Sequence, residues 1–291
     1  MGKHLVISGC SFTQHNRPET WYHNLKTDYD HPDVAEIHNV GIGGAGNYII
    51  STMCINKVSE LLKEGVRPED VYVVIQWSGV SRKSFIGDNR PSILPVDFSH
   101  CQAESEIKTL AAAGGSSKFC WDIGKKNDER YWINYKDNYW SDECAFIETL
   151  ENILRVQWFL KSSGVDFLMF LGWDIFTNPD SGQHMHGSWA GWFKANDGRG
   201  QWDEKLPYVN SQNALLKDEF RWSTHLWGMI DFSCFTFFEN PKIKLGGMMQ
   251  WGQHNLPSSL WYCATNDPHP SQDVQTGFYK MHIRPWLWER I

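Results

Sequence analysis

The chain lacks the sequence features of several common protein classes. Its seven cysteines include no C-x-x-C pair, it has no apolar run close to the roughly 20 residues that a membrane span needs, and it has no block of lysine or arginine. These absences argue against a zinc knuckle, a disulfide framework, a membrane partner and general nucleic-acid binding. The net charge of −7 also disfavours nucleic-acid binding. The N-terminus has no secretory signal pattern, so we expect a cytoplasmic protein with reduced thiols.

What the chain has is apolar and aromatic content. Of its 291 residues, 41% are hydrophobic and sixteen are tryptophans. This is enough apolar surface for a sizeable core, so we expect a folded globule. Tryptophan faces stack on sugar rings, but tryptophans also fill cores and interfaces, and the composition leaves both interpretations open.

Apolar runs of strand length alternate with segments of helical periodicity. The runs that we expect as strands are 5–8, 36–40, 71–76, 166–171 and 260–264, and the segments expected as helices are 47–63, 143–163, 211–229 and 272–286. Strand, helix and strand in alternation predict a parallel α/β sheet. Regular patterns fail over about 81–140 and 173–260, which we interpret as two large irregular insertions in a single domain spanning 1–291.

The first strand ends at Gly9, and Ser11 follows directly in Gly-Cys-Ser-Phe-Thr. We expect a helix to begin there. A hydroxyl at such a junction lies beside unpaired backbone N–H groups, which can orient it and stabilise an oxyanion. The position makes Ser11 a candidate nucleophile, although a first-turn serine is also a common helix cap.

Three later segments also follow expected strands. A glycine cluster over 41–46 leads into Asn47, a Trp77-Ser78-Gly79 turn follows the third strand, and Asp267-Pro268-His269-Pro270 precedes the last helix. Ligand sites of parallel α/β sheets lie at the carboxyl ends of the strands. We therefore expect these segments to meet Ser11 in one site.

The order of these blocks resembles the SGNH, or GDSL-like, hydrolase family, over about 130 core residues. The resemblance implies a three-layer α/β/α sandwich with a flavodoxin-like parallel sheet of about five strands in the order 2-1-3-4-5. It also implies that Ser11 is the nucleophile and His269 the general base. Gly44 is the best match to the glycine whose N–H joins that of Ser11 in the oxyanion hole, with Gly46 as the alternative register.

The sequence departs from the family pattern at three places. Cys10 stands where the family has aspartate, and we expect a buried packing residue there. The family's orienting acid is commonly three residues before the histidine, where this chain has Asn266; Asp267, two residues before, is an acid and is preferred. If neither reaches the ring, a Ser-His dyad remains.

The third departure affects the oxyanion hole. The family's Gly-x-Asn-Asp is absent after the third strand, so the usual side-chain amide donor is missing. The candidates that replace it are the Ser78 hydroxyl, a backbone N–H of this turn and Asn47. In the same turn, Trp77 and Arg82 are candidates for substrate contact, and a surface salt bridge is the alternative role for Arg82.

A second group of residues is a candidate metal site. His184 and His186, with Asp174 and Asp180 nearby, have the alternation that puts two imidazoles on one face of a strand. No third fixed ligand accompanies them. We therefore expect neither a metal nor an organic cofactor.

These residues predict a serine esterase that works through an acyl-enzyme, acting on a small-molecule or saccharide ester such as an O-acetyl sugar. The alternatives are an O-acyltransferase, and a glycan-binding or structural virion module that keeps the fold without the activity. The signal-free form with its Cys-Ser-Phe-Thr block also resembles proteins of tailed phages, which leaves a virion or an infected cell as alternative locations. The sequence predicts no oligomeric state.

Overall fold

The computed structural model describes residues 2–15, 17–29, 34–79, 82–83, 121–122, 142–172, 175, 225–240, 245–264 and 267–291. The two insertions expected over about 81–140 and 173–260 lie largely outside these ranges. So does the helix expected over 211–229, apart from a helical turn at 225–227.

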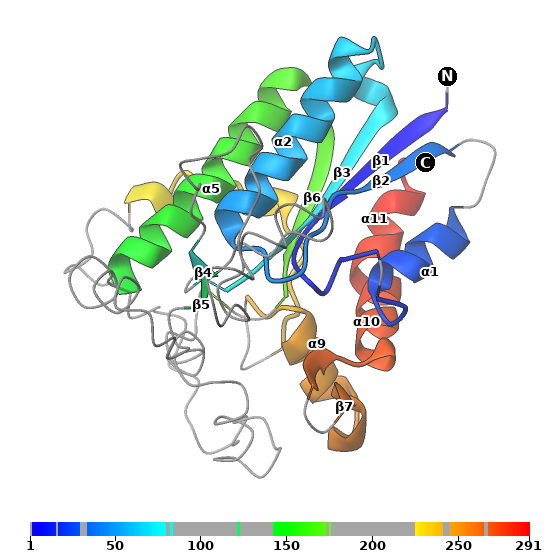
Figure 1. The fold of residues 1–291 in the computed structure, drawn as a ribbon, viewed down its shortest axis with the longest axis vertical. Coiled ribbons are helices and arrows are strands. Elements are labelled where there is room, and N and C mark those ends of the chain that lie inside the picture. The colour runs from blue at the N-terminus through cyan, green and yellow to red at the C-terminus, as the bar shows by residue number, and fades with distance from the viewer. Residues whose placement is uncertain are drawn as a thin grey trace, which may run out of the picture.

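A four-stranded parallel sheet forms the centre of the molecule (Figure 1). Its strands, in spatial order, are β2 (Val34–Asn39), β1 (Lys3–Ser8), β3 (Val71–Trp77) and β6 (Asp166–Leu171). Every residue of β3 is buried, as expected for a central strand that is covered on both faces. The parallel α/β class is therefore correct, and these strands follow the predicted order 2-1-3-4.

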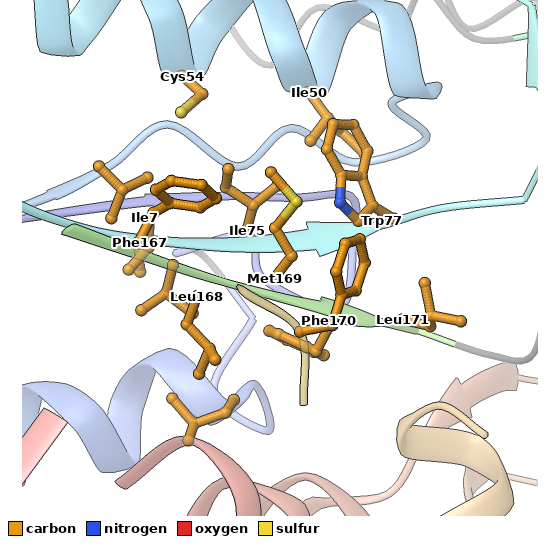
Figure 2. Close-up of a cluster of buried hydrophobic side chains, with 14 of the residues drawn as sticks. Ile7, Ile50, Cys54, Ile75, Trp77, Phe167, Leu168, Met169, Phe170 and Leu171 are labelled. Carbon is orange, nitrogen blue, oxygen red and sulfur yellow. The ribbon is translucent and has the colours of Figure 1, made fainter. Parts of the chain in front are cut away.

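Helices connect the strands and cover the sheet. On one side, α2 (Asn47–Lys63) packs beside α5 (Asp142–Ser163), and the Ser8 hydroxyl donates to the Ile50 carbonyl oxygen of α2 at 2.8 Å. Residues on alternate positions of a strand point to opposite faces. Trp77 points toward Ile50 of α2 (Figure 2), whereas Phe170, which pairs with the preceding Gln76, has its ring against Trp21 and Phe278 on the other side.

The opposite side is covered by segments from both ends of the chain. Helix α1 (Trp21–Asp28) contacts α10 (Gln272–Phe278), which continues through a π-helical stretch, Tyr279–Ile283, into α11 (Arg284–Trp288). The rings of Trp21 and Phe278 lie 5.6 and 5.3 Å from that of Phe170, measured between ring centroids. Early and late segments of the chain are thus packed together beneath one strand.

The remaining elements are short. They are the 3-10 helices Pro68–Asp70, Phe232–Cys234 and Ser258–Leu260, helix α9 (Met248–Asn255), the strand pair β4 (Arg82–Lys83) and β5 (Trp121–Asp122), and the pair β7 (Tyr262–Ala264) and β8 (Asp267–Pro270). The five described cysteines, Cys10, Cys54, Cys144, Cys234 and Cys263, are thiols and not part of a disulfide. Among the described residues, no helix combines the length and the apolarity that crossing a bilayer requires.

The expected last strand was placed wrongly. Residues 260–264 do not extend the central sheet: β7 pairs antiparallel with β8 in a separate sheet of two strands. Cys263 and Ala264 of β7 are exposed, so this strand lacks the buried faces of a central one. Within the described residues, the position beside β6 holds a single parallel bridge, between Met169 and Phe235, supported by a 2.9 Å bond from the Thr236 N–H to the Met169 carbonyl.

Candidate active site

Ser11 and His269 lie together, although 258 residues separate them in the sequence. The Nε2 atom of His269 is 2.8 Å from the Ser11 Oγ atom, which is hydrogen-bond distance. Ser11 is buried, with 7% of its surface exposed, and His269 is partly buried. An imidazole in contact with a serine hydroxyl is the arrangement needed to remove the hydroxyl proton.

Ser11 lies in an isolated turn instead of the predicted first turn of a helix. The Cys10 carbonyl accepts hydrogen bonds from the N–H groups of Thr13, at 2.9 Å, and Gln14, at 3.2 Å. The first helix after β1 begins only at Trp21. Pro18 disfavours helical backbone at the residue before it, which accounts for the delay. Ser11 therefore lies in a single turn and not at the N-terminus of a helix.

Gln76 of β3 holds this turn from inside the protein. Its Oε1 atom accepts from the Cys10 N–H at 3.1 Å, the Cys10 thiol at 3.2 Å and the Thr13 hydroxyl at 3.3 Å. Gln76 and Cys10 are fully buried, and Cys10 is the packing residue that we expected. Gly9 is required here because a Cβ atom would lie 2.3 Å from the Thr13 Oγ1 atom. The residue after β1 must therefore be glycine.

The loop after β2 is bonded to the same turn. Asn39 donates from its Nδ2 atom to the Thr13 carbonyl at 2.8 Å, and its Oδ1 atom accepts from the Gly41 N–H at 2.9 Å. Gly44, the expected oxyanion glycine, has φ of +76°, a left-handed conformation that favours glycine. In the described part of the chain, neither the Gly44 N–H nor the Ser11 N–H donates a hydrogen bond. Both stay candidates for the oxyanion hole.

Two residues at the end of β3 and the start of α2 differ from expectation. Trp77 was predicted to touch substrate, but it is fully buried and belongs to the hydrophobic core on the α2 side of the sheet (Figure 2). Asn47 was a candidate oxyanion donor, but its Nδ2 atom donates to the Ser78 carbonyl and to the Thr149 hydroxyl, each at 3.1 Å. Its Oδ1 atom accepts from the Ser78 N–H at 2.9 Å. Because both amide protons are engaged, Asn47 positions Ser78 instead of serving a ligand.

Ser78 remains a candidate donor after this correction. Its hydroxyl is buried and has no hydrogen-bond partner among the described residues. A buried hydroxyl without a partner costs free energy, so the state of this group needs an explanation. Gly46, the alternative to Gly44, precedes α2 as its N-cap residue.

The segment that carries His269 is restrained by its sequence. Pro268 and Pro270 flank the histidine, and a residue before proline is confined to extended backbone. The ring of Phe12, next to the nucleophile, meets the His269 ring edge to face with centroids 5.7 Å apart. Asp267 is the first residue of β8, two before His269, but its side chain is not described, and Asn266 lies outside the described residues.

Other predicted residues fall partly or wholly outside the description. Arg82 belongs to β4, but its side chain is not described. His184, His186, Asp174 and Asp180, weighed as metal ligands, lie outside the described ranges.

A different group of potential metal ligands occurs on β1 and β2, formed by His4, Glu36 and His38. The Nδ1 atom of His4 is 3.1 Å from the Nε2 atom of His38, while the ring centroids are 5.4 Å apart and the rings are within 7° of parallel. The nitrogens thus face each other along the line joining the rings. Two nitrogens that bind one tetrahedral zinc ion at about 2.0–2.1 Å lie about 3.4 Å apart, but the lone pairs of these nitrogens point at each other and not at a shared ion.

This histidine pair is therefore joined by a hydrogen bond in the described conformation. Burial lowers the pKa of His38 from its ordinary value, and the charge of Glu36, whose Oε1 atom is 3.5 Å from the His38 Nδ1 atom, opposes that shift. A neutral His38 can share one proton with His4. The pair stabilises the edge of the sheet and does not form a preformed metal centre.

Sequence reasoning did not identify the residues that hold the site together. Gln76 and Asn39 contact the nucleophile turn directly, and neither was assigned a role. One signal was available for Gln76, since it is the only polar side chain in the run Val71–Gln76 apart from the tyrosine hydroxyl. A buried carboxamide at the carboxyl end of a central strand must bond to something nearby.

Comparisons of the chain with protein-family models, with curated proteins and with solved structures found no match. A function for this chain is therefore inferred from the geometry of its residues.

Proposed function

We propose that this protein is a serine esterase of the SGNH type, which hydrolyses a carboxylic ester through an acyl-enzyme. One observation carries the proposal: the 2.8 Å contact between the Ser11 Oγ and His269 Nε2 atoms at the carboxyl end of a parallel sheet. A serine hydroxyl is a weak nucleophile unless a base accepts its proton, and a neutral imidazole is suited to that task.

The first half of the reaction forms the acyl-enzyme. The Ser11 oxygen attacks the ester carbonyl carbon while its proton passes to the His269 Nε2 atom, and the carbonyl π electrons move to oxygen. The tetrahedral oxyanion then collapses, the bond to the leaving alcohol breaks, and that alcohol takes the proton from His269.

The second half regenerates the enzyme. Water attacks the acyl carbon and gives a proton to His269, and the second oxyanion collapses with cleavage of the bond to Ser11. The proton returns from His269 to the Ser11 oxygen, and a carboxylic acid leaves. One ester and one water yield one acid and one alcohol, so the balance requires no cofactor.

The oxyanion would be held by the N–H groups of Ser11 and Gly44. Both belong to loops bonded to each other, because the Ile42 N–H donates to the Gly9 carbonyl at 3.0 Å. Each such donor is worth about 10²–10³ in rate in a comparable hydrolase. The Ser78 hydroxyl is the third donor that we assign, in place of the amide that the third block lacks.

Asp267 is the group that we assign to orient His269. It stands two residues before the histidine, in the same strand β8, and its side chain lies outside the described part of the structure. A carboxylate is a better partner than an amide for the imidazolium that forms during the reaction. Without such contact, the site would operate as a Ser-His dyad.

The proposal includes the finer features of the fold and the substrate. Helices against the sheet and the bridge at Phe235 beside β6 support a three-layer sandwich with a fifth strand position. The aromatic content supports a saccharide ester, such as an O-acetyl sugar, as substrate.

Hydrolysis of p-nitrophenyl acetate and labelling by a fluorophosphonate test the assignment. The wild type should hydrolyse the ester and take up one label on Ser11, located by mass spectrometry. Ser11→Ala and His269→Ala should each lose at least about 10³-fold in kcat, in line with triad deletions in other enzymes. Ser162→Ala, on the exposed side of α5, is the control and should retain the wild-type rate.

The outcomes separate the rival functions. Equal activity in wild type and Ser11→Ala would overturn the assignment. A wild type that is inert to a panel of esters and unlabelled would instead favour a binding or virion module. If a sugar is added as acceptor and its acetyl ester accumulates, the same two residues catalyse acyl transfer.

A further inference from the structure

The nucleophile turn and the histidine segment are joined by a second connection behind the Ser11–His269 contact. Trp21, the first residue of α1, is its centre and is fully buried. The Trp21 indole Nε1–H donates to the Thr13 Oγ1 atom at 3.1 Å, and the Thr13 hydroxyl in turn donates to Gln76 at 3.3 Å. The indole is therefore fixed to the turn that carries Ser11.

The backbone of Trp21 leads in the other direction. Its N–H, one of the unpaired amides at the start of a helix, donates to the Gln275 Oε1 atom at 3.0 Å. The Nε2 atom of Gln275 donates to the Pro270 carbonyl at 3.2 Å, and Gln275 is 1% exposed. One buried carboxamide thus bonds both α1 and the residue that follows His269.

The hydrogen bond from Gln275 ends on the segment around Pro270, whose backbone is already restrained. The Pro270 carbonyl also accepts from the Cys263 thiol at 3.1 Å, and the Ser271 N–H donates to the Trp261 carbonyl at 3.1 Å. With proline on both sides, the His269 backbone follows wherever Pro270 is held. A shift of Pro270 is consequently passed to the imidazole.

We propose that Gln275 is a positioning residue that, through Trp21 and Pro270, fixes His269 relative to Ser11. The inference rests on the proposed function, because its consequence is measured as catalysis. Gln275 contacts neither reacting group and acts only through the backbone at Pro270 and the indole at Thr13. Misplacement of catalytic groups by 1 Å can cost about 10²-fold in rate.

Gln275→Met tests the proposal because it keeps the length and volume of the side chain and removes both hydrogen bonds. We expect kcat for p-nitrophenyl acetate to fall by about 10- to 100-fold, with KM within about twofold, since ground-state binding is not altered. Fluorophosphonate labelling of Ser11 should slow by a similar factor.

Thr276→Val is the matched control. Thr276 and Asn24 exchange hydrogen bonds of 3.1 and 3.3 Å between the same two helices, α10 and α1, but neither contacts Pro270 or Thr13. This variant should lose thermal stability without losing more than about twofold in kcat. If both variants lose kcat in proportion to their stability, Gln275 is merely structural and the inference is wrong.

Trp21→Phe gives an independent check of the path. It removes the indole N–H bond to Thr13 while keeping an aromatic ring and the backbone N–H. Since both substitutions interrupt one connection, the double variant should lose less in kcat than the product of the two single losses. Losses that multiply would contradict the path.

The outcomes also distinguish this inference from the proposed function. If Ser11→Ala is as active as the wild type, the proposed function fails first. If the wild type is active through Ser11 and Gln275→Met keeps kcat within twofold of it, the proposed function stands and the positioning role is refuted.

Discussion

Replacing Gln76 with leucine removes an acceptor that, in the described part of the chain, takes three hydrogen bonds from the turn of Ser11. Leucine is close to glutamine in size, so the main change is the loss of hydrogen bonds. The Cys10 N–H, bonded at 3.1 Å, would be left buried and unpaired, which costs about 1–3 kcal/mol. The Trp77 carbonyl loses its 2.6 Å bond from Gln76 but keeps one from the Gly172 N–H at 3.0 Å.

The lost hydrogen bond to the Trp77 carbonyl adds about 1 kcal/mol to the cost of the unpaired Cys10 N–H, so the expected destabilisation is about 2 to 4 kcal/mol. At about 2 °C per kcal/mol for a chain of this size, Tm should fall by about 4 to 8 °C. The freed Cys10 amide would also let the turn shift relative to His269. We therefore expect kcat for p-nitrophenyl acetate to drop by at least about tenfold at a temperature where the variant is still folded.

Gln157→Leu is the control for this prediction. Gln157 of α5 is also buried and also bridges backbone groups, donating to the Met229 carbonyl at 3.1 Å and accepting from the Asp231 N–H at 2.7 Å. Its loss should lower Tm similarly and leave kcat within about twofold. If Gln76→Leu is destabilised as expected but hydrolyses the ester at the wild-type rate, the argument that Gln76 holds the nucleophile in place is refuted.

Two further predictions concern histidines away from the site. Burial lowers the pKa of His282 to about 4, so as pH falls from 6.5 to 4 the unfolded state gains a proton first and about 2.5 kcal/mol of stability should be lost. Chemical denaturation across this range should show the loss in the wild type and a flatter curve in His282→Gln; parallel curves would contradict it. Because His4 and His38 are joined by a hydrogen bond, micromolar zinc should leave Tm within about 1 °C of the value in chelator. If zinc raises the Tm of the wild type but not that of His4→Ala, the pair opens to bind metal and the prediction is wrong.

The central elements could be predicted because their sequences are locally unambiguous. The helix expected at 47–63 and the strand at 166–171 have the observed bounds, and the run at 71–76 is one residue short of β3. Long periodic segments and continuous β-branched runs require little tertiary information. Helix α1 was missed because its eight residues bury only Trp21 and Leu25, too few for a clear period.

The site was predictable in part, for a related reason. Ser11 and His269 have distinctive local sequences, and the parallel sheet brings strand ends together. Trp77 was misassigned because a tryptophan at a strand end has the same sequence signature whether it faces a ligand or the core. Asn47 and Gln275 could not be interpreted from sequence, since the role of a carboxamide depends on which backbone groups the fold places beside it.

The 258-residue separation of Ser11 and His269 has a consequence during synthesis. A ribosome that adds about 5–20 residues per second takes about 13 to 52 s to proceed from the serine to the histidine. Throughout that interval the nascent chain carries a hydroxyl that has no base and is therefore unreactive. An esterase assembled in this order would not act on cellular esters before its last helices have emerged. Chains that terminate before residue 269 would be inactive because they lack the histidine.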